Sequence, residues 1–142
     1  MGSNGTSEHR GPDLTGRKLY IPEMSYSGAA AFAAAFRSVG FEAEVCPASD
    51  ARTLELGGRY TSGEECLPAR VTLGNFLKII EKPGFDPSKA AFFMPTADGP
   101  CRFGQYAPYI RKVLRDMGME QVPVFSPSSR DGYSGMAEHK NE

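Results

Sequence analysis

Strand-like apolar runs that alternate with helical segments constrain this chain more than any other feature of its sequence. Residues 18–22 (KLYIP) have the pattern of a short buried strand that a proline ends. Residues 29–39 are rich in alanine and predict a helix, which residues 27–28 open and Gly40 ends. Residues 41–45 alternate enough to form a second strand. Such a strand–helix–strand unit is expected to have a right-handed crossover and parallel strands.

The middle of the chain predicts two further helical segments. Residues 49–56 have the pattern of a short capped turn, which the glycines at 57–58 are expected to end. The residues at 61–62 each stand three positions before a glutamate, which is the spacing of a capping box, and Pro68 suits the first turn of a helix. A proline–glycine pair at 83–84 is expected to stop that helix. The apolar residues that share one of its faces are Leu73, Phe76, Leu77 and Ile80.

The rest of the chain repeats the alternation. Residues 90–95 predict a third strand, residues 103–117 a helix that Gly118 ends, and residues 122–125 a fourth strand. The fold class is therefore α/β: a three-layer sandwich with a parallel, roughly four-stranded sheet of the Rossmann or flavodoxin type. Ligands bind such sheets at the carboxyl ends of the strands. The predicted buried face of the last helix consists of Tyr106, Ile110, Val113, Leu114 and Met117.

Composition sets the expected boundaries of the domain. Residues 1–16 are polar and rich in glycine, serine and charge, and are expected to be a disordered leader or tag. Residues 126–142 have no periodic apolar pattern and are expected to be a flexible C-terminal tail. The α/β domain is then expected to span residues 17–125, which is small for a complete enzyme.

Charge and hydropathy argue against several classes of protein. The formal net charge is −1 and no basic stripe is present, so no nucleic-acid partner is expected. The longest apolar run, at residues 29–36, is too short to span a bilayer, and no secretory signal is recognisable. Three cysteines do not suggest a disulfide framework, which favours a reducing, cytoplasmic setting.

Two of the three cysteines lie in loops directly ahead of helix-patterned segments. Cys66 lies in TSGEECLP at residues 61–68, and Cys101 lies in MPTADGPCRFGQY at residues 94–106. Free backbone amides and the positive end of a helix dipole favour a deprotonated sulfur at such junctions. A functional role is favoured over core filler for Cys101. For Cys66 taken alone, metal ligand and core filler are balanced, and the similar position of Cys101 favours the ligand. Cys46 ends a strand and is expected to be buried filler.

Other site chemistries have little support in the sequence. There is no C-x-x-C pair, and the two histidines, His9 and His139, lie in the ends expected to be disordered, so a complete zinc site cannot be drawn. A P-loop and a dinucleotide glycine fingerprint are also absent. Arg102 is either a solvated charge or a cation that offsets a thiolate or cluster. Gln105 and Tyr106 fit either a helix surface and core face or hydrogen bonds to cluster sulfurs.

The two cysteine loops carry a resemblance to a known family. Residues 60–68 (YTSGEECLP) followed by 72–76 (TLGNF), together with 94–95 and 99–106 (GPCRFGQY), resemble the 2-hydroxyacyl-CoA dehydratase superfamily. Within it, the chain resembles the dehydratase-like domain of the CoA-substrate-specific enzyme activase proteins, and the match spans roughly residues 19–124. On this resemblance the chain is a single-lobe fragment or a reduced relative.

The resemblance implies an iron–sulfur protein of anaerobic metabolism. Cys66 and Cys101 would bind a [4Fe–4S] cluster, and an ATP-dependent iron–sulfur activator or a second dehydratase-like lobe would be the partner. The chain would act in low-potential electron transfer or in radical dehydration of an acyl-CoA substrate, as part of a lyase system that it does not complete alone. The residues expected to support the two ligands are Ser62, Gly63, Gly99, Arg102 and Gln105.

The sequence departs from the family in ways that keep alternatives open. The family has a third cluster cysteine later in the chain, and no cysteine follows Cys101. One alternative is therefore a non-enzymatic α/β binding or assembly module that has lost its cluster. Another is a thiol-redox or zinc site shared across a homodimer, in which two copies of Cys66 and Cys101 supply four thiolates.

Overall fold

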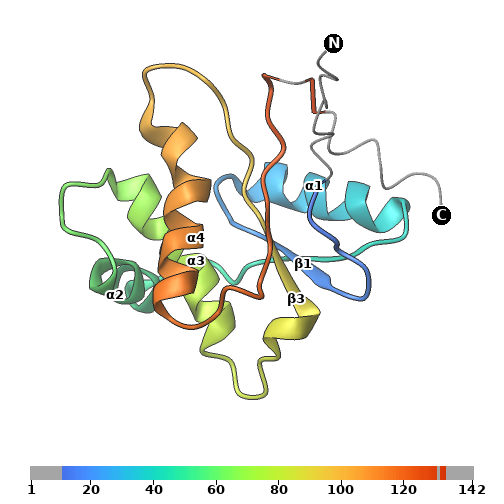
Figure 1. The fold of residues 1–142 in the computed structure, drawn as a ribbon, viewed down its shortest axis with the longest axis horizontal. Coiled ribbons are helices and arrows are strands. Elements are labelled where there is room, and N and C mark those ends of the chain that lie inside the picture. Colours follow the sequence, from blue (N-terminus) through green and yellow to red (C-terminus); the bar gives the residue numbers. More distant parts are fainter. Residues whose placement is uncertain (1–10, 131, 134–142) are drawn as a thin grey trace, which may run out of the picture.

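A computed structural model describes residues 11–130, 132 and 133 of the chain (Figure 1). Residues 1–10 of the expected leader lie outside the described residues, as do residues 131 and 134–142 of the expected tail. His9 and His139 therefore lie outside them as well.

Four parallel strands form one sheet in the order β2–β1–β3–β4, which confirms the predicted α/β class. The strands are β1 (Lys18–Ile21), β2 (Glu42–Val45), β3 (Ala90–Phe93) and β4 (Val124–Phe125). All four side chains of β3 are buried, as expected of a central strand covered on both faces. Because every strand runs in the same direction, the loops that follow them gather at one edge of the sheet.

The helices cover both faces of the sheet (Figure 1). On one face, α1 (Tyr26–Ser38) packs Ala29, Ala33 and Phe36 against a cluster that includes Phe93. On the other face lie α2 (Ala51–Arg59), α3 (Leu67–Ile80) and α4 (Tyr106–Asp116), whose apolar residues pack together with β3. These three layers match the predicted sandwich.

The core beneath α3 and α4 follows the predicted helical faces closely. Phe76 of α3 stacks on Phe92 of β3, with ring centroids 4.4 Å apart. Ile79 is fully buried, whereas Ile80, which the pattern placed on the buried face, is only partly buried. On α4 all the predicted residues are buried except Met117, which is partly buried beyond the end of the helix.

The glycines at 57–58 do not end a helix, contrary to the sequence-based prediction. They lie inside α2, where a Cβ on Gly57 would stand 2.0 Å from the backbone oxygen of Arg70 in α3. Gly74 of α3 makes the reciprocal approach, since its Cβ would stand 2.0 Å from the backbone oxygen of Thr53. The prediction was wrong because glycine serves close helix packing as well as helix termination.

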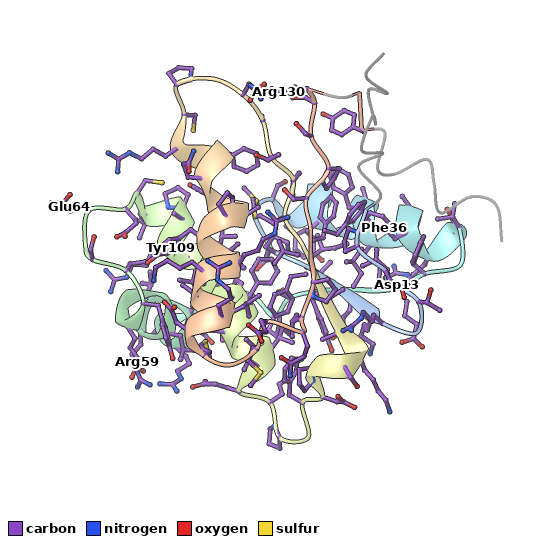
Figure 2. All side chains as sticks on the ribbon, in the orientation of Figure 1. Asp13, Phe36, Arg59, Glu64, Tyr109 and Arg130 are labelled. Carbon is purple, nitrogen blue, oxygen red and sulfur yellow. The ribbon has the colours of Figure 1, made fainter. Side chains whose placement is uncertain are left out.

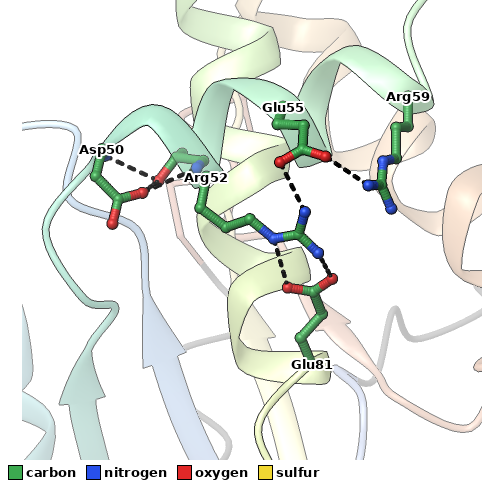
Figure 3. A network of polar contacts seen from close by, with 6 residues as sticks. Asp50, Arg52, Glu55, Arg59 and Glu81 are labelled. Carbon is green, nitrogen blue, oxygen red and sulfur yellow. Dashed lines mark hydrogen bonds and ion pairs between the residues drawn. The ribbon is translucent and has the colours of Figure 1, made fainter.

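Polar contacts also hold α2 in place (Figure 3). Asp50 caps the helix: its carboxylate accepts from the Thr53 amide at 3.0 Å, and the Thr53 hydroxyl accepts from the Asp50 amide. Arg52 bridges Glu55 of its own helix to Glu81 at the end of α3. The cap confirms the predicted start of this helix.

The predicted capping boxes ahead of α3 are not formed. The Ser62 amide does donate to the Glu65 carboxylate at 2.9 Å, and the Gly63 amide does so at 3.1 Å. These bonds close a separate turn, however, because α3 begins only at Leu67, with Cys66 as its N-cap residue. Pro68 lies in the first turn of α3 as predicted. The helix α1 likewise starts earlier than expected, because Ser25 caps it.

The packed part of the domain extends past both expected boundaries. Leu14, in the expected leader, is buried in the core on the α1 side of the sheet. Past β4, the Thr96 amide donates to the Pro127 carbonyl, and Thr96 forms a parallel bridge with Ser128. The loop that follows β3 is thus paired at its start with the segment that follows β4.

Candidate functional site

Two helices that begin at the same edge of the sheet bring the cysteine loops together. The helix α3 leads into β3 and α4 leads into β4. Because both strands are parallel to β1, both helices start near the carboxyl ends of the strands. Cys66 directly precedes α3, and Cys101 directly precedes a short 3₁₀ turn (Arg102–Gln105) that continues into α4. Both thiols are exposed.

Tyr106 joins the two loops. This residue begins α4 and is buried, and its hydroxyl lies 2.9 Å from the Sγ atom of Cys66, forty positions earlier in the chain. Burial raises the pKa of the Tyr106 hydroxyl, and the charges of Cys66 and Cys101 raise it further. Both cysteines therefore lie within electrostatic reach of one tyrosine, whose hydroxyl keeps its proton at physiological pH.

The surroundings of Cys66 favour its thiolate. The hydrogen bond from Tyr106 is the largest cause that lowers the pKa of Cys66, and the backbone amide of Ala69 in the first turn of α3 adds to it. The charge of Arg102 lowers the pKa of Cys66 further. The Arg102 guanidinium also contacts the backbone oxygen of Glu64 at 3.4 Å, which ties the two loops together a second time.

A cleft of about 450 Å³ opens beside the Cys66 thiol. Tyr109, labelled in Figure 2, extends from α4 and lines the cleft. Its hydroxyl donates to the backbone oxygen of Tyr60, ahead of the first cysteine loop. The surface of the cleft is mainly apolar, with charged groups from both sides. Its lining residues are Glu65, Cys66, Ala69, Arg102, Gln105, Tyr106, Pro108, Tyr109, Ile110 and Lys112.

The other residues expected to support a cluster divide into two groups. Arg102 and Gln105 line the cleft beside Cys66. Ser62 and Gly63 instead form the turn that Glu65 closes, and their described hydrogen bonds are within that turn. Gly99 has a φ of +138°, a backbone conformation that residues with a side chain rarely adopt. This glycine gives the second cysteine loop its bend.

Sequence reasoning did not single out Tyr109 or Lys112, which also line the cleft. They lie on α4, three and six positions after Tyr106, and Tyr109 faces the first cysteine loop. The sequence did hold a signal for Tyr109: it stands three positions after Tyr106, and side chains at that spacing share a helix face.

Cys46 has the structural role that the sequence predicted. Its side chain is 3% exposed and packs in the core with residues of α3 and β3. Burial raises the pKa of the Cys46 thiol to about 12, so the thiol stays protonated at physiological pH. Cys46 is therefore a buried, protonated thiol with which the reactivity of the two exposed cysteines can be compared.

Thiolates are the ligands that iron–sulfur clusters and zinc favour. Cys66 and Cys101 offer two such ligands at one edge of the sheet, with a hydrogen-bond donor and a cation beside them. Within residues 11–130, 132 and 133, no group of three or more His, Cys, Asp or Glu side chains is arranged to hold a metal ion. The described residues alone therefore do not make a complete metal site.

Comparison of this chain with protein-family models, with curated protein sequences and with solved structures gives no significant match. In the described part of the chain, none of the helices has the length and apolar character that crossing a bilayer requires.

Proposed function

We propose that this chain is the iron–sulfur lobe of a protein of the 2-hydroxyacyl-CoA dehydratase and activase type. In this proposal Cys66 and Cys101 are two ligands of a [4Fe–4S] cluster, and the lobe works in low-potential electron transfer or radical dehydration with partner subunits. When bound, such a cluster supplies one-electron chemistry at a potential that its protein environment sets.

One contact carries the proposal. The 2.9 Å contact between the Tyr106 hydroxyl and the Cys66 Sγ atom joins the loop of the first cysteine to the helix that the second cysteine opens. An exposed thiol that contacts a buried tyrosine, with an arginine and a second exposed cysteine on the other loop, has the features of a ligand site rather than of core filler. Hydrogen bonds to ligand sulfur atoms and nearby charge are also what tunes the potential of a cluster.

Each residue of the site has a distinct role in this proposal. Cys66 and Cys101 bind as thiolates, and the Tyr106 hydroxyl donates to the Cys66 sulfur and fixes its direction. Arg102 offsets negative charge beside Cys66. The cleft next to Cys66 gives an acyl-CoA substrate or a partner segment access to the same edge. An ATP-dependent iron–sulfur activator would supply the electrons.

Anaerobic reconstitution with ferrous iron and sulfide tests this function. We expect the wild-type chain to bind iron and sulfide and to gain a broad visible absorption, and the Cys66→Ser/Cys101→Ser double variant to gain neither. Cys46→Ala is the matched control, because Cys46 is buried away from the cleft, and it should bind iron as the wild type does. A folded wild type that takes up no iron would favour a non-enzymatic α/β binding or assembly module instead.

A further inference from the structure

The outer side of α1 is more apolar than the fold requires. The helix packs Ala29, Ala33 and Phe36 into the core. Residues 24–36, which include most of the helix, nevertheless contain no charged residue. The helices α2 and α4, in contrast, carry ion pairs on their exposed sides. Because a helix that is apolar all round is normally buried, the outer side of α1 is expected to be covered by a partner.

Four residues form one stripe along this outer side: Gly28, Phe32, Ala35 and Val39. They stand four, three and four positions apart, which is the spacing of residues that face a partner in a pair of helices. Phe32 is 46% exposed, Val39 at the end of the helix is 56% exposed, and Ala35 is exposed as well. Small and large side chains therefore alternate along an exposed stripe.

A twofold axis makes this stripe complementary to itself. An axis that crosses the stripe midway between Phe32 and Ala35 pairs Phe32 of each copy with Ala35 of the other. The same axis pairs Gly28 of each copy with Val39 of the other. The two helices then run in opposite directions, and every large side chain of the stripe lies against a small one.

A shallow apolar hollow lies where Val39 of a second copy would arrive. Its volume is about 100 Å³, and Gly28 lines it together with Met24, Phe32 and Pro95. A water-sized group takes about 30 Å³, so the hollow has room for about three such groups, the number of carbon atoms in a valine side chain. A Cβ on Gly28 would meet only the side chain three positions earlier in the chain. No contact with another element therefore requires a glycine at this position.

A second copy suits this stripe better than other occupants. Residues 1–10 and 134–142, which lie outside the described residues, are mainly polar or charged in sequence. A helix that binds a membrane surface is typically rich in basic residues beside its apolar side. The only charged residue of α1 is Arg37, whose guanidinium donates to the Ala43 carbonyl at 2.9 Å. The alternation of sizes instead matches the same stripe in the opposite direction.

We propose that two copies of this chain form a dimer by antiparallel pairing of their α1 helices along the stripe of Gly28, Phe32, Ala35 and Val39. The stripe belongs to the helix on the face of the sheet opposite α2, α3 and α4 (Figure 1). The dimer therefore leaves the two cysteine loops and their cleft free, and it does not depend on the proposed function.

Light scattering coupled to gel filtration of the purified chain, over a range of concentrations, tests the inference. Ala35→Lys puts a charge at the centre of the stripe, and a lysine towards the C-terminal end of α1 suits the helix dipole. Ala30→Lys is the matched control, because Ala30 is an exposed alanine of the same helix that points to a different side. Circular dichroism checks that each variant folds.

A mixing experiment tests the antiparallel register. Phe32→Glu and Ala35→Lys are each expected to be monomeric alone. When the two variants are mixed, the new glutamate of one chain faces the new lysine of the other, and the second Phe32–Ala35 pair keeps its wild-type residues. We therefore expect the mixture to form a heterodimer, because opposite charges across an interface select the matching partner.

We expect wild type and Ala30→Lys to elute as dimers, and the dissociation constant of Ala35→Lys to rise at least about tenfold. A wild type that stays monomeric at about 100 μM, or equal dimerisation of Ala35→Lys and Ala30→Lys, overturns the inference. A mixture of folded Phe32→Glu and Ala35→Lys chains that stays monomeric overturns the antiparallel pairing.

Two further measurements separate the dimer from the alternatives. The Cys66→Ser/Cys101→Ser variant should dimerise as wild type does, because the stripe is remote from both thiols. Loss of the dimer in this variant would contradict pairing through α1 and leave the proposed function standing. A monomeric wild type that sediments with phosphatidylcholine vesicles would overturn the dimer and assign the stripe to a membrane surface instead.

Discussion

The helices α2 and α3 are tightly packed against each other, whereas the edge of the sheet that carries Cys66 and Cys101, the cysteine edge, is loosely packed. Between α2 and α3, the two backbones meet through Gly57 and Gly74 with no room for a methyl group. At the cysteine edge, Gly63 and Gly99 have nothing within 4 Å of the position of a Cβ, and both thiols are exposed. The first region is built for stability, and the second leaves space in front of groups that can bind a ligand.

Substitution of a glycine in each region is expected to give the largest difference in the free energy of unfolding. Gly74→Ala forces the new methyl group against the Thr53 carbonyl, and overpacking of this kind costs on the order of 3 kcal/mol of unfolding free energy. Gly63→Ala meets no atoms and bears only the strain of a φ of +97°, about 1 kcal/mol. Urea denaturation followed by circular dichroism measures both. Equal losses at the two positions would contradict the contrast between the regions.

The buried and exposed cysteines should respond differently to alkaline pH. The folded state holds the Cys46 proton up to a pKa of about 12, whereas the unfolded chain releases it near a pH of about 8.5. Cys46 therefore contributes stability at neutral pH that is lost as pH rises above the unfolded value, by up to about 1.4 kcal/mol per pH unit. The unfolding free energy of Cys46→Ala, measured by denaturant titration from neutral to alkaline pH, should fall less steeply than that of wild type. If the unfolding free energies of wild type and Cys46→Ala fell in parallel with pH, burial would not hold the Cys46 proton.

Acid pH tests the cap that holds α2. Lys78 first, and then the Thr53 amide, lower the pKa of the Asp50 carboxyl to about 2. The cap therefore stabilises the fold above the unfolded pKa of about 3.9, and this contribution disappears as pH falls towards 2. Asp50→Ala should melt at a lower temperature than wild type at neutral pH, and the gap should close in acid. Asp50→Asn keeps a capping side chain and should fall between the two. A gap that persists at low pH would mean that the charge of Asp50 does not matter.

The smallest change tests the cysteine edge alone. Tyr106→Phe removes the hydroxyl that favours the Cys66 thiolate, so the pKa of Cys66 should rise and its alkylation by iodoacetamide near neutral pH should slow. Mass spectrometry of the metal-free protein gives the rate at Cys66 separately from the other thiols. Tyr109→Phe is the control, because the Tyr109 hydroxyl bonds the Tyr60 backbone instead. The same rate in wild type and Tyr106→Phe would show that the contact has no influence on the thiol.

The sequence predicted the regular part of this fold well, because it depends on local patterns. The apolar runs became the four strands, and Gly40 and Gly118, each with a positive φ, follow the two helices that they were expected to end. Residues 57–58 misled the prediction, since a glycine pair looks the same in sequence whether it ends a helix or admits a neighbouring backbone. Ser62 and Glu65 misled it similarly, because their pairing closes a turn rather than a helix.

The candidate site was only partly predictable, for a different reason. The loop position of Cys66 and Cys101 could be inferred from the glycine and proline residues around them. The contact between Cys66 and Tyr106 depends on how α3 and α4 pack side by side, which no local pattern encodes. The same holds for the cleft and for the reach of Arg102 to Glu64 across the two loops.

The central claim is that Cys66 and Cys101 together form one ligand site, and thiol protection tests it most directly. The chain is alkylated before and after anaerobic reconstitution, and each cysteine is quantified by peptide mass spectrometry. We predict that Cys66 and Cys101 react readily in the metal-free chain and become protected together on reconstitution, while Cys46 reacts only after unfolding in both samples. Bound iron that leaves either Cys66 or Cys101 as reactive as before would contradict the claim.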